Sequence, residues 1–139
     1  MAPTSKVLGI DLGTTNSCMA IIQAGELKVI PNRENEKTTP SVVSLRPGGD
    51  MMVGRLAKRQ AATNGANTIF SVKRFMGMKL NDPAVEKNRS LVPYGMAAAP
   101  NGDAWVVAAG KSFSPPEISA MVLQKLKNDA ESFLGWVPV

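Results

Sequence analysis

Two short apolar runs separated by four turn residues constrain the fold of this chain more than any other feature. The runs extend from Val7 to Leu12 and from Ser17 to Ile22, and Gly13-Thr14-Thr15-Asn16 lies between them. Apolar runs of this length predict buried strands, and glycine adopts the backbone angles that a tight turn requires. The sequence therefore predicts an antiparallel hairpin with Asp11 near the end of its first, buried strand.

Short strands and one short helix are predicted after this hairpin. The strands are expected over residues 27–30, 41–45, 51–53 and 104–108, and the helix over 55–63. The strand at 27–30 would complete an antiparallel meander with the hairpin. The stretch 71–80 mixes basic and apolar residues around Gly77 and favours neither a helix nor a strand.

The clearest helix is predicted over residues 114–134. Ser114 is a typical N-cap, Pro115 suits the first turn, and Glu117 three residues after the cap indicates a capping box. Apolar residues then recur at near-helical spacing, at Ile118, Val122, Leu126, Ala130 and Phe133. Gly135 is the expected stop, and the tail from Trp136 to Val139 is expected to have no structure of its own.

The hairpin turn carries groups suited to phosphate. Backbone N–H groups from Gly13 to Asn16 can form an anion-binding concavity, to which Thr14 and Thr15 add hydroxyl donors. Asp11 can hold Mg²⁺ through water, because Mg²⁺ keeps much of its water shell. The P-loop and dinucleotide motifs do not occur in the sequence, so a hairpin would hold the phosphates. An ordinary Gly-Thr turn fits the same residues, and the pattern by itself favours neither interpretation.

The chain has no histidine and a single cysteine, Cys18. Without histidine, Ser-His-Asp and Cys-His catalysis and histidine-based metal sites are excluded. Hydrolysis would have to depend on positioning, carboxylates, lysine and a metal ion. A lone cysteine fits a reducing compartment, and Cys18 itself is interpreted as a small buried apolar residue.

Charge and hydropathy argue against nucleic-acid and membrane partners. The net charge is +5, but the basic residues are scattered, and only Lys58-Arg59 and Lys73-Arg74 are adjacent. A solvated basic surface is favoured over a nucleic-acid interface, since no basic cluster is interleaved with aromatic residues. No apolar run approaches the ~20 residues of a membrane helix, and Met1 to Lys6 lack a secretory apolar stretch.

The segment G-I-D-L-G-T-T-N-S-C, from Gly9 to Cys18, resembles the first phosphate motif of the DnaK-type seventy-kilodalton heat-shock chaperones. These chaperones belong to the actin-like ATPase superfamily. Four further segments resemble the same family in order and at its spacing: T-T-P-S-V-V at 38–43, V-G-R-L-A-K-R-Q-A at 53–61, S-V-K-R-F-M-G at 71–77 and S-P-P-E-I-S-A-M-V-L-Q-K-L-K at 114–127. The resemblance covers roughly Lys6 to Gly135 and is closest to bacterial and mitochondrial members. It implies a cytoplasmic protein of bacterial type, with the mitochondrial or plastid matrix as alternatives.

The resemblance implies an α/β fold of the α+β type with mixed sheets: the first lobe, incomplete, of an actin-like, ribonuclease H-like ATPase domain. Residues of about 6–38 and 114–135 would form the core subdomain, and about 39–113 a peripheral subdomain. A second phosphate hairpin, the adenosine pocket and the peptide-binding domain are expected to lie outside this chain. Because Trp136 to Val139 do not resemble the family's continuation, an isolated piece, a truncated product and a frameshifted remnant all stay open.

Site roles also follow from the resemblance, position by position. Asp11 would lie near the Mg²⁺, and Lys73 would hold the γ-phosphate and the attacking water. The β- and γ-phosphates of ATP or ADP would contact Gly13, Thr14, Thr15 and Asn16. An ammonium group suits that role, because phosphoryl transfer needs charge neutralisation and little covalent help. By itself, Lys73-Arg74 is more typical of a solvated basic pair.

The implied parent protein hydrolyses ATP to drive binding and release of unfolded polypeptide. Its expected partners are the polypeptides, a J-domain co-chaperone and a nucleotide-exchange factor. Half a phosphate site predicts affinity for ATP of about millimolar or weaker, and no steady-state hydrolysis by this chain alone. The alternative is a non-catalytic remnant or interaction module that self-associates through an open sheet edge. For Cys18, the family suggests a redox-responsive thiol as the alternative.

Overall fold

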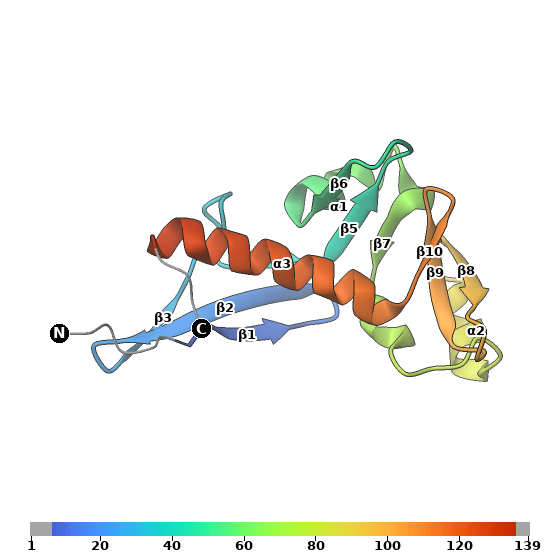
Figure 1. Cartoon of the computed structure of the whole chain (residues 1–139), viewed down its shortest axis with the longest axis horizontal. Helices are drawn as coiled ribbons and strands as arrows, with labels where there is room; N and C mark the ends of the chain where they lie inside the picture. Colours follow the sequence, from blue (N-terminus) through green and yellow to red (C-terminus); the bar gives the residue numbers. More distant parts are fainter. Residues whose placement is uncertain (1–6, 136–139) are drawn as a thin grey trace.

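The computed structural model describes residues 7–135, which form three small sheets joined by one long helix (Figure 1). The expectations for Met1 to Lys6 and for Trp136 to Val139 concern residues outside that range. Each of the strand pairs in the three sheets is antiparallel. This arrangement of helices and small sheets confirms the α/β class and the ATPase-lobe interpretation.

The first sheet is the predicted meander. Strands β1 (Gly9–Leu12), β2 (Asn16–Gln23) and β3 (Glu26–Val29) follow one another in space as they do in the sequence, and the short β4 (Thr39–Pro40) pairs with the start of β2. The β1–β2 register places Asp11 opposite Cys18. The carboxylate therefore lies two positions before the turn, as the sequence predicts.

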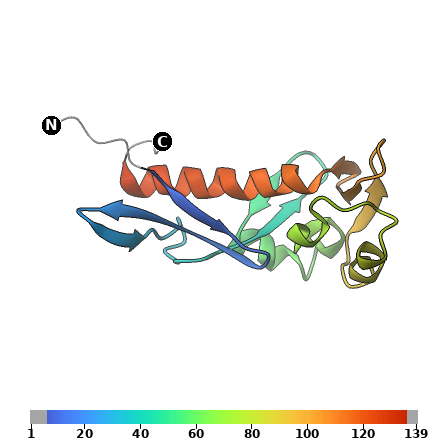
Figure 2. The same cartoon turned by 90° about the horizontal axis from the view of Figure 1, so that it is seen from below.

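The prediction that the first strand is buried is wrong. Gly9, Ile10 and Asp11 are exposed, because β1 lies at the edge of the sheet and the long helix α3 covers only one face. Figure 2 shows α3 along one side of this sheet. In the central strand β2, Ser17, Met19 and Ile21 share the face toward α3 and are buried, and among the described residues no element covers the other face.

The second and third sheets each have a buried central strand. In the second sheet, β5 (Val42–Leu45) lies between β6 (Met51–Val53) and β7 (Thr68–Phe70), and helix α1 (Arg55–Gln60) packs against it. In the third, β9 (Ala104–Ala108) lies between β8 (Gly95–Ala98) and β10 (Lys111–Phe113). Three short helical segments complete the fold: the 3₁₀ turns η1 (Gly65–Asn67) and η2 (Val72–Phe75), and helix α2 (Pro83–Arg89).

The strands predicted at 41–45, 51–53 and 104–108 are confirmed within a residue, and the helix predicted over 55–63 ends earlier, at Gln60. Besides the two-residue β4 and the 3₁₀ turns η1 and η2, four elements were not predicted: β7, α2, β8 and β10. β7 and β10 have three residues each, and β8 consists of Gly, Met and two Ala, so none carries a sequence periodicity of its own. These strands form because β5 and β9 offer them partners.

Helix α3 (Pro115–Leu134) has the predicted ends. The Ser114 hydroxyl accepts a hydrogen bond from the Glu117 backbone N–H at 3.2 Å, and the Glu117 carboxylate accepts one from the Ser114 N–H at 3.1 Å. Gly135 adopts a φ of 75°, the left-handed conformation that ends a helix with little strain in glycine. Both predicted signals are therefore confirmed.

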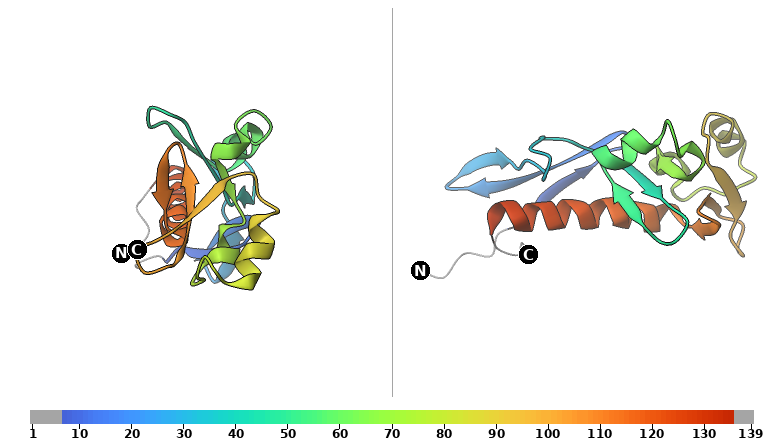
Figure 3. Two further views of the ribbon diagram at one scale, coloured as in Figure 1. Left: turned by 90° about the vertical axis from the view of Figure 1, so that its right-hand side faces the viewer. Right: turned by 90° about the horizontal axis from the view of Figure 1, so that it is seen from above.

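One face of α3 packs against all three sheets (Figure 3). Its buried apolar residues are Ile118, Val122, Leu126 and Ala130. Phe133, which the spacing assigns to the same stripe, is instead 45% exposed, and the Lys28 ammonium lies 5.3 Å from its ring centroid. No helix among residues 7–135 has both the length and the apolar character needed to cross a membrane.

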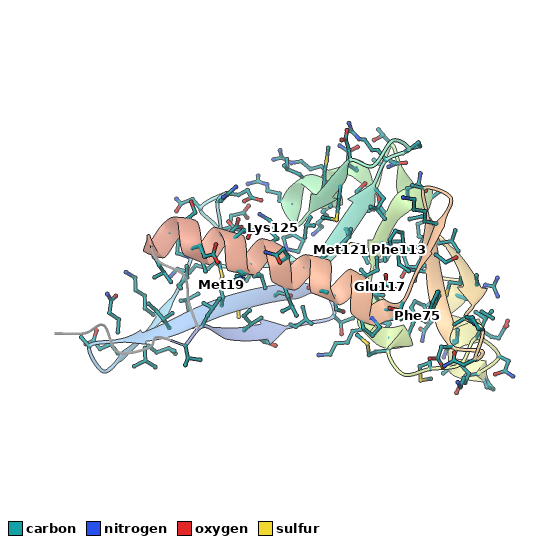
Figure 4. All side chains as sticks on the ribbon, in the orientation of Figure 1. Met19, Phe75, Phe113, Glu117, Met121 and Lys125 are labelled. Carbon is teal, nitrogen blue, oxygen red and sulfur yellow. The ribbon has the colours of Figure 1, made fainter. Side chains whose placement is uncertain are left out.

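A charged cluster fastens α3 to the loop after β3. The Lys125 ammonium lies between Asp129, at 2.7 Å, and Glu34, at 3.2 Å, and the Asp129 carboxylate also accepts a hydrogen bond from the Arg33 N–H. Asp129 is only 3% exposed, and Figure 4 shows Lys125 extending from the side of α3. A buried carboxylate with these partners cannot lose them without leaving an uncompensated charge in the fold.

Replacing Asp129 by Ala should lower the free energy of unfolding by about 3 kcal/mol, because Lys125 then loses its closest buried partner. The matched control is Glu131→Ala on the same helix, whose ion pair with Lys127 is long, at 3.6 Å, and more exposed. That change should cost less than about 0.5 kcal/mol. Urea unfolding followed by circular dichroism measures both, and equal losses would contradict the role given to the cluster.

Candidate phosphate-binding site

The turn between β1 and β2 is too tight for any residue but glycine at its first position. A Cβ added to Gly13 would lie far inside van der Waals contact with the Asn16 carbonyl oxygen. Thr14 is half-buried, whereas Thr15, Asn16 and Asp11 are exposed. The turn and Asp11 therefore present hydroxyl, amide and carboxylate side chains at the surface.

A buried serine from the segment after β4 braces this turn from behind. The Ser41 hydroxyl donates to the Gly13 carbonyl oxygen at 2.8 Å, and the Ser41 N–H donates to the Thr15 carbonyl oxygen at 2.9 Å. The Ser17 and Ser41 hydroxyl oxygens also lie 2.8 Å apart. Because the Gly13 and Thr15 carbonyl groups point toward Ser41, the N–H groups of Thr14 and Asn16, in the same peptide units, point the opposite way. Sequence reasoning missed this role of Ser41, although the T-T-P-S segment was singled out by resemblance.

Lys73 reaches the turn from a distant part of the chain. Its ammonium donates a hydrogen bond to the Leu12 carbonyl oxygen at 3.0 Å, between residues 61 positions apart. The Lys73 side chain is exposed, so the ammonium is both close to the turn and open to solvent. The structure thus brings together all the site residues predicted from the sequence: Asp11, Gly13, Thr14, Thr15, Asn16 and Lys73.

The 3₁₀ turn η2 holds Lys73 by burying the residues on either side of it. Val72 is 7% exposed and Phe75 is 1% exposed, and η2 packs against the start of α3. Figure 4 shows Phe75 near Glu117, in the first turn of that helix. With these two apolar side chains directed inward, the consecutive basic residues Lys73 and Arg74 remain at the surface. This alternation of buried apolar and exposed basic residues within one short 3₁₀ turn explains why the sequence at 71–80 indicated neither a helix nor a strand.

Tyr94 lies behind the strand that leads into η2. Its hydroxyl donates a hydrogen bond to the Phe70 carbonyl oxygen, and its ring meets the Phe70 ring edge to face, with centroids 5.6 Å apart. Burial raises the pKa of the Tyr94 hydroxyl well above its usual value near 10, and the positive charge of Arg74 opposes that shift. The hydroxyl therefore stays protonated and remains a donor.

The metal-ligating groups at the turn suit Mg²⁺ only in company with a phosphate ligand. Among residues 7–135, no three Cys, Asp or Glu side chains gather closely enough to hold a metal ion. Asp11 is a single exposed carboxylate beside a phosphate-type turn, which fits Mg²⁺ held through water and phosphate oxygens, because Mg²⁺ takes few protein ligands. Cys18, opposite Asp11, is half-buried rather than buried, because the outer face of β2 is uncovered.

A cavity of about 210 Å³ lies beside the turn and is lined by Thr14, Thr15, Phe70 and Ser71 among others. Two larger cavities, of about 380 and 510 Å³, lie away from the turn. The wall of the first contains the Lys125–Asp129 ion pair, and the wall of the second contains Lys79, whose ammonium is paired with Asp103. The chemistry of the turn, rather than cavity volume, identifies the candidate site.

The fold and the hairpin turn, braced by Ser41 and approached by Lys73, fit the class of α/β ATPase lobes. Comparison with family models agrees with this class: the model described as Hsp70 protein matches residues 7–137. The chain therefore belongs to the Hsp70 protein family, whose ATPase domains generally use a nucleotide and Mg²⁺. The match extends through Trp136 and Val137, whereas the sequence motifs predict a resemblance to the family only as far as about Gly135.

Replacing Gly13 by Ala should open the turn and lower the free energy of unfolding by about 2 kcal/mol, because the new Cβ displaces the Asn16 carbonyl group. Gly9→Ala is the matched control on the same strand. Its added Cβ would meet the Ala20 carbonyl oxygen at 3.5 Å, an ordinary contact, so its effect should stay within about 0.5 kcal/mol. Urea unfolding compares the two variants, and a Gly13→Ala protein as stable as Gly9→Ala would contradict the described turn.

The raised pKa of Tyr94 predicts a loss of stability at alkaline pH. The folded state binds the phenolic proton more tightly than the unfolded state. The resulting contribution to the free energy of unfolding is complete below pH 10.0 and is lost as pH rises toward the folded-state pKa. Above pH 10.0, the wild-type chain should lose up to about 1.4 kcal/mol of stability per pH unit relative to Tyr94→Phe. Urea unfolding from about pH 8 to about pH 11 measures the difference. Parallel curves for the two proteins would contradict burial of a neutral tyrosine.

Proposed function

We propose that this chain supplies the wall that holds the β- and γ-phosphates of ATP or ADP in a chaperone ATPase. One observation carries the proposal: the Lys73 ammonium lies 3.0 Å from the Leu12 carbonyl oxygen, directly beside the phosphate-type turn. Surface lysines seldom gain by being fixed to a neutral carbonyl, and an ammonium fixed here faces the position of a bound anion. Membership of the Hsp70 family supports a nucleotide as that anion.

In this proposal the turn binds phosphate by its backbone and hydroxyl groups. The N–H groups of Thr14 and Asn16 point away from Ser41, because the carbonyl groups of the same peptide units accept hydrogen bonds from it. Thr14 and Thr15 add hydroxyl donors. Asp11 would hold Mg²⁺ through water, and Mg²⁺, when bound, neutralises charge on the phosphate oxygens. Asp11 is fixed by the β1–β2 register at a constant distance from the turn.

Lys73 has the role of neutralising the terminal phosphate in the same proposal. Its exposed ammonium has three donor positions, of which the Leu12 carbonyl oxygen occupies one. The remaining donors can therefore meet phosphate oxygens and orient a water molecule while the side chain keeps its contact with β1. Charge stabilisation of this kind needs no histidine, which agrees with a chain that has none.

Membership of the Hsp70 family supports a proposal for the biological role. We propose that the intact protein uses ATP binding and hydrolysis to bind and release unfolded polypeptide, assisted by a J-domain co-chaperone and a nucleotide-exchange factor. Residues 6–38 and 114–135 would be its core subdomain and 39–113 a peripheral one, in a bacterial-type cytoplasm or an organelle matrix. The support is the match to the Hsp70 family model over residues 7–137. The DnaK-type assignment within that family is also part of this proposal.

Mg²⁺-ATP should bind this chain with a Kd of about 1 mM or weaker, because phosphate contacts alone provide about 4 kcal/mol. Asp11→Ala and Lys73→Ala should each weaken binding about tenfold. Asp50→Ala is the matched control: it removes one exposed carboxylate in the loop between β5 and β6, away from the turn, and should leave binding unchanged. Isothermal titration calorimetry measures all four proteins. Equal affinities for Asp11→Ala and Asp50→Ala would refute the proposed site.

A second candidate function has a separate observation in its favour. Ile22 and Leu27, which pair across β2 and β3, are 61% and 71% exposed on the face of the sheet opposite α3. An exposed apolar sheet face next to an edge strand is typical of an interaction module. Flat heats with Mg²⁺-ATP, together with a molecular mass that rises with concentration in light scattering, would favour this function over the first.

A further inference from the structure

The backbone takes an unusual conformation directly before the turn that carries Lys73. Ser71, which joins β7 to η2, has φ 55° and ψ 28°, in the left-handed region that residues with a side chain rarely adopt. Such a conformation is strained for a residue with a side chain and persists only where its surroundings hold it in place. Among residues 7–135, the other non-glycine residues with positive φ are Ala24, Asn35 and Ala109. Of these four, only Ser71 lies within two positions of a residue of the candidate site.

Tyr94 is the group that holds the chain on the N-terminal side of Ser71. Its hydroxyl donates to the carbonyl oxygen of Phe70, the residue immediately before Ser71, and its ring packs edge to face on the Phe70 ring. Tyr94 is 3% exposed, so this hydrogen bond does not compete with solvent. A buried donor aimed at the peptide group before a strained residue restricts the angles available to that residue.

Buried apolar side chains hold the chain on the C-terminal side of Ser71. Val72 and Phe75 lie in the core, and η2 packs against α3 and α2. The backbone is thus fixed before Ser71 by Tyr94 and after it by Phe75, and Ser71 supplies the change of direction. That change directs Lys73 toward β1, where its ammonium meets the Leu12 carbonyl oxygen.

We propose that Tyr94, through its hydroxyl, and Ser71, through its left-handed backbone, are positioning residues for Lys73. The proposal rests on the proposed function for its purpose, since Lys73 needs a fixed place only if it serves a phosphate ligand. The expected effect on Lys73 does not depend on a bound nucleotide. Removing the Tyr94 hydroxyl or the left-handed conformation of Ser71 should release the Lys73 ammonium from the Leu12 carbonyl oxygen.

Two substitutions separate positioning from simple packing. Tyr94→Phe keeps the ring and its contact with Phe70 and removes only the hydroxyl. Ser71→Val disfavours the left-handed region because of its branched Cβ, whereas Ser71→Gly adopts that region freely. The matched control is Ser90→Ala, which removes a hydroxyl that bonds to the Lys87 carbonyl oxygen on the exposed helix α2.

The test is nitrogen-15 NMR of the lysine side-chain ammonium groups in the nucleotide-free chain, at low temperature and mildly acidic pH. The Lys73 signal is assigned by its loss in Lys73→Arg. Its hydrogen exchange with water should be about fivefold faster in Tyr94→Phe and Ser71→Val, the factor that one lost hydrogen bond produces. Ser71→Gly and Ser90→Ala should leave the exchange rate at the wild-type value.

An unchanged Lys73 signal in Tyr94→Phe would overturn the proposal, and so would equal acceleration in Tyr94→Phe and Ser90→Ala. Tyr94→Phe and Ser71→Gly suffice if Ser71→Val does not fold. Because the measurement uses no nucleotide, its failure is distinct from failure of the proposed function, which the calorimetry of Asp11→Ala decides. A chain that shows the predicted exchange rates but does not bind Mg²⁺-ATP would retain the positioning and lose its proposed purpose.

Discussion

The packing of one face of α3 against three separate sheets is the interaction on which the rest of the structure depends. Each sheet has only three or four strands, and none buries enough apolar surface alone to offset the entropy of ordering its chain. Ile118, Val122 and Leu126 provide the shared core, together with strand residues such as Val43 and Val106. The capping box at Ser114 and the cluster around Asp129 fix where this helix begins and how it lies over the loop after β3.

The candidate site is a consequence of that packing. The 3₁₀ turn η2 is held between α3 and α2, and it brings Lys73 to the edge strand β1. Ser41 donates hydrogen bonds to the Gly13 and Thr15 carbonyl groups of the turn between β1 and β2. The N–H groups of the same two peptide units therefore point away from Ser41, where an anion could meet them. An anion site of this kind needs rigid donors more than many donors, because preorganised groups lose little freedom when the ligand binds.

The chemistry of the site agrees with the family to which the chain belongs. A hairpin turn with one carboxylate and one nearby ammonium binds charge and orients it, and it contains no nucleophile or general base of its own. In the proposed function, such a wall would contribute to phosphoryl transfer by position and electrostatics, and membership of the Hsp70 family supports a nucleotide as its ligand. The outer face of the first sheet exposes the apolar side chains of Ile22 and Leu27. An exposed apolar face of this kind is one against which a further surface can pack.

Local chemistry in the sequence determined the hairpin at Gly13, the meander, the strands β5, β6 and β9, and both ends of α3, because turn residues, alternation and caps act over a few neighbours. Turn chemistry also identified Asp11, Gly13, Thr14, Thr15 and Asn16 as candidate site residues, whereas Lys73 was identified by resemblance alone. Only the tertiary structure decided that β1 is exposed, that Ser41 braces the turn, and that Tyr94 and Ser71 lead the chain to Lys73. Contacts such as Lys73–Leu12 join residues 61 positions apart, and no pattern of neighbouring residues encodes which distant groups a shared core brings together.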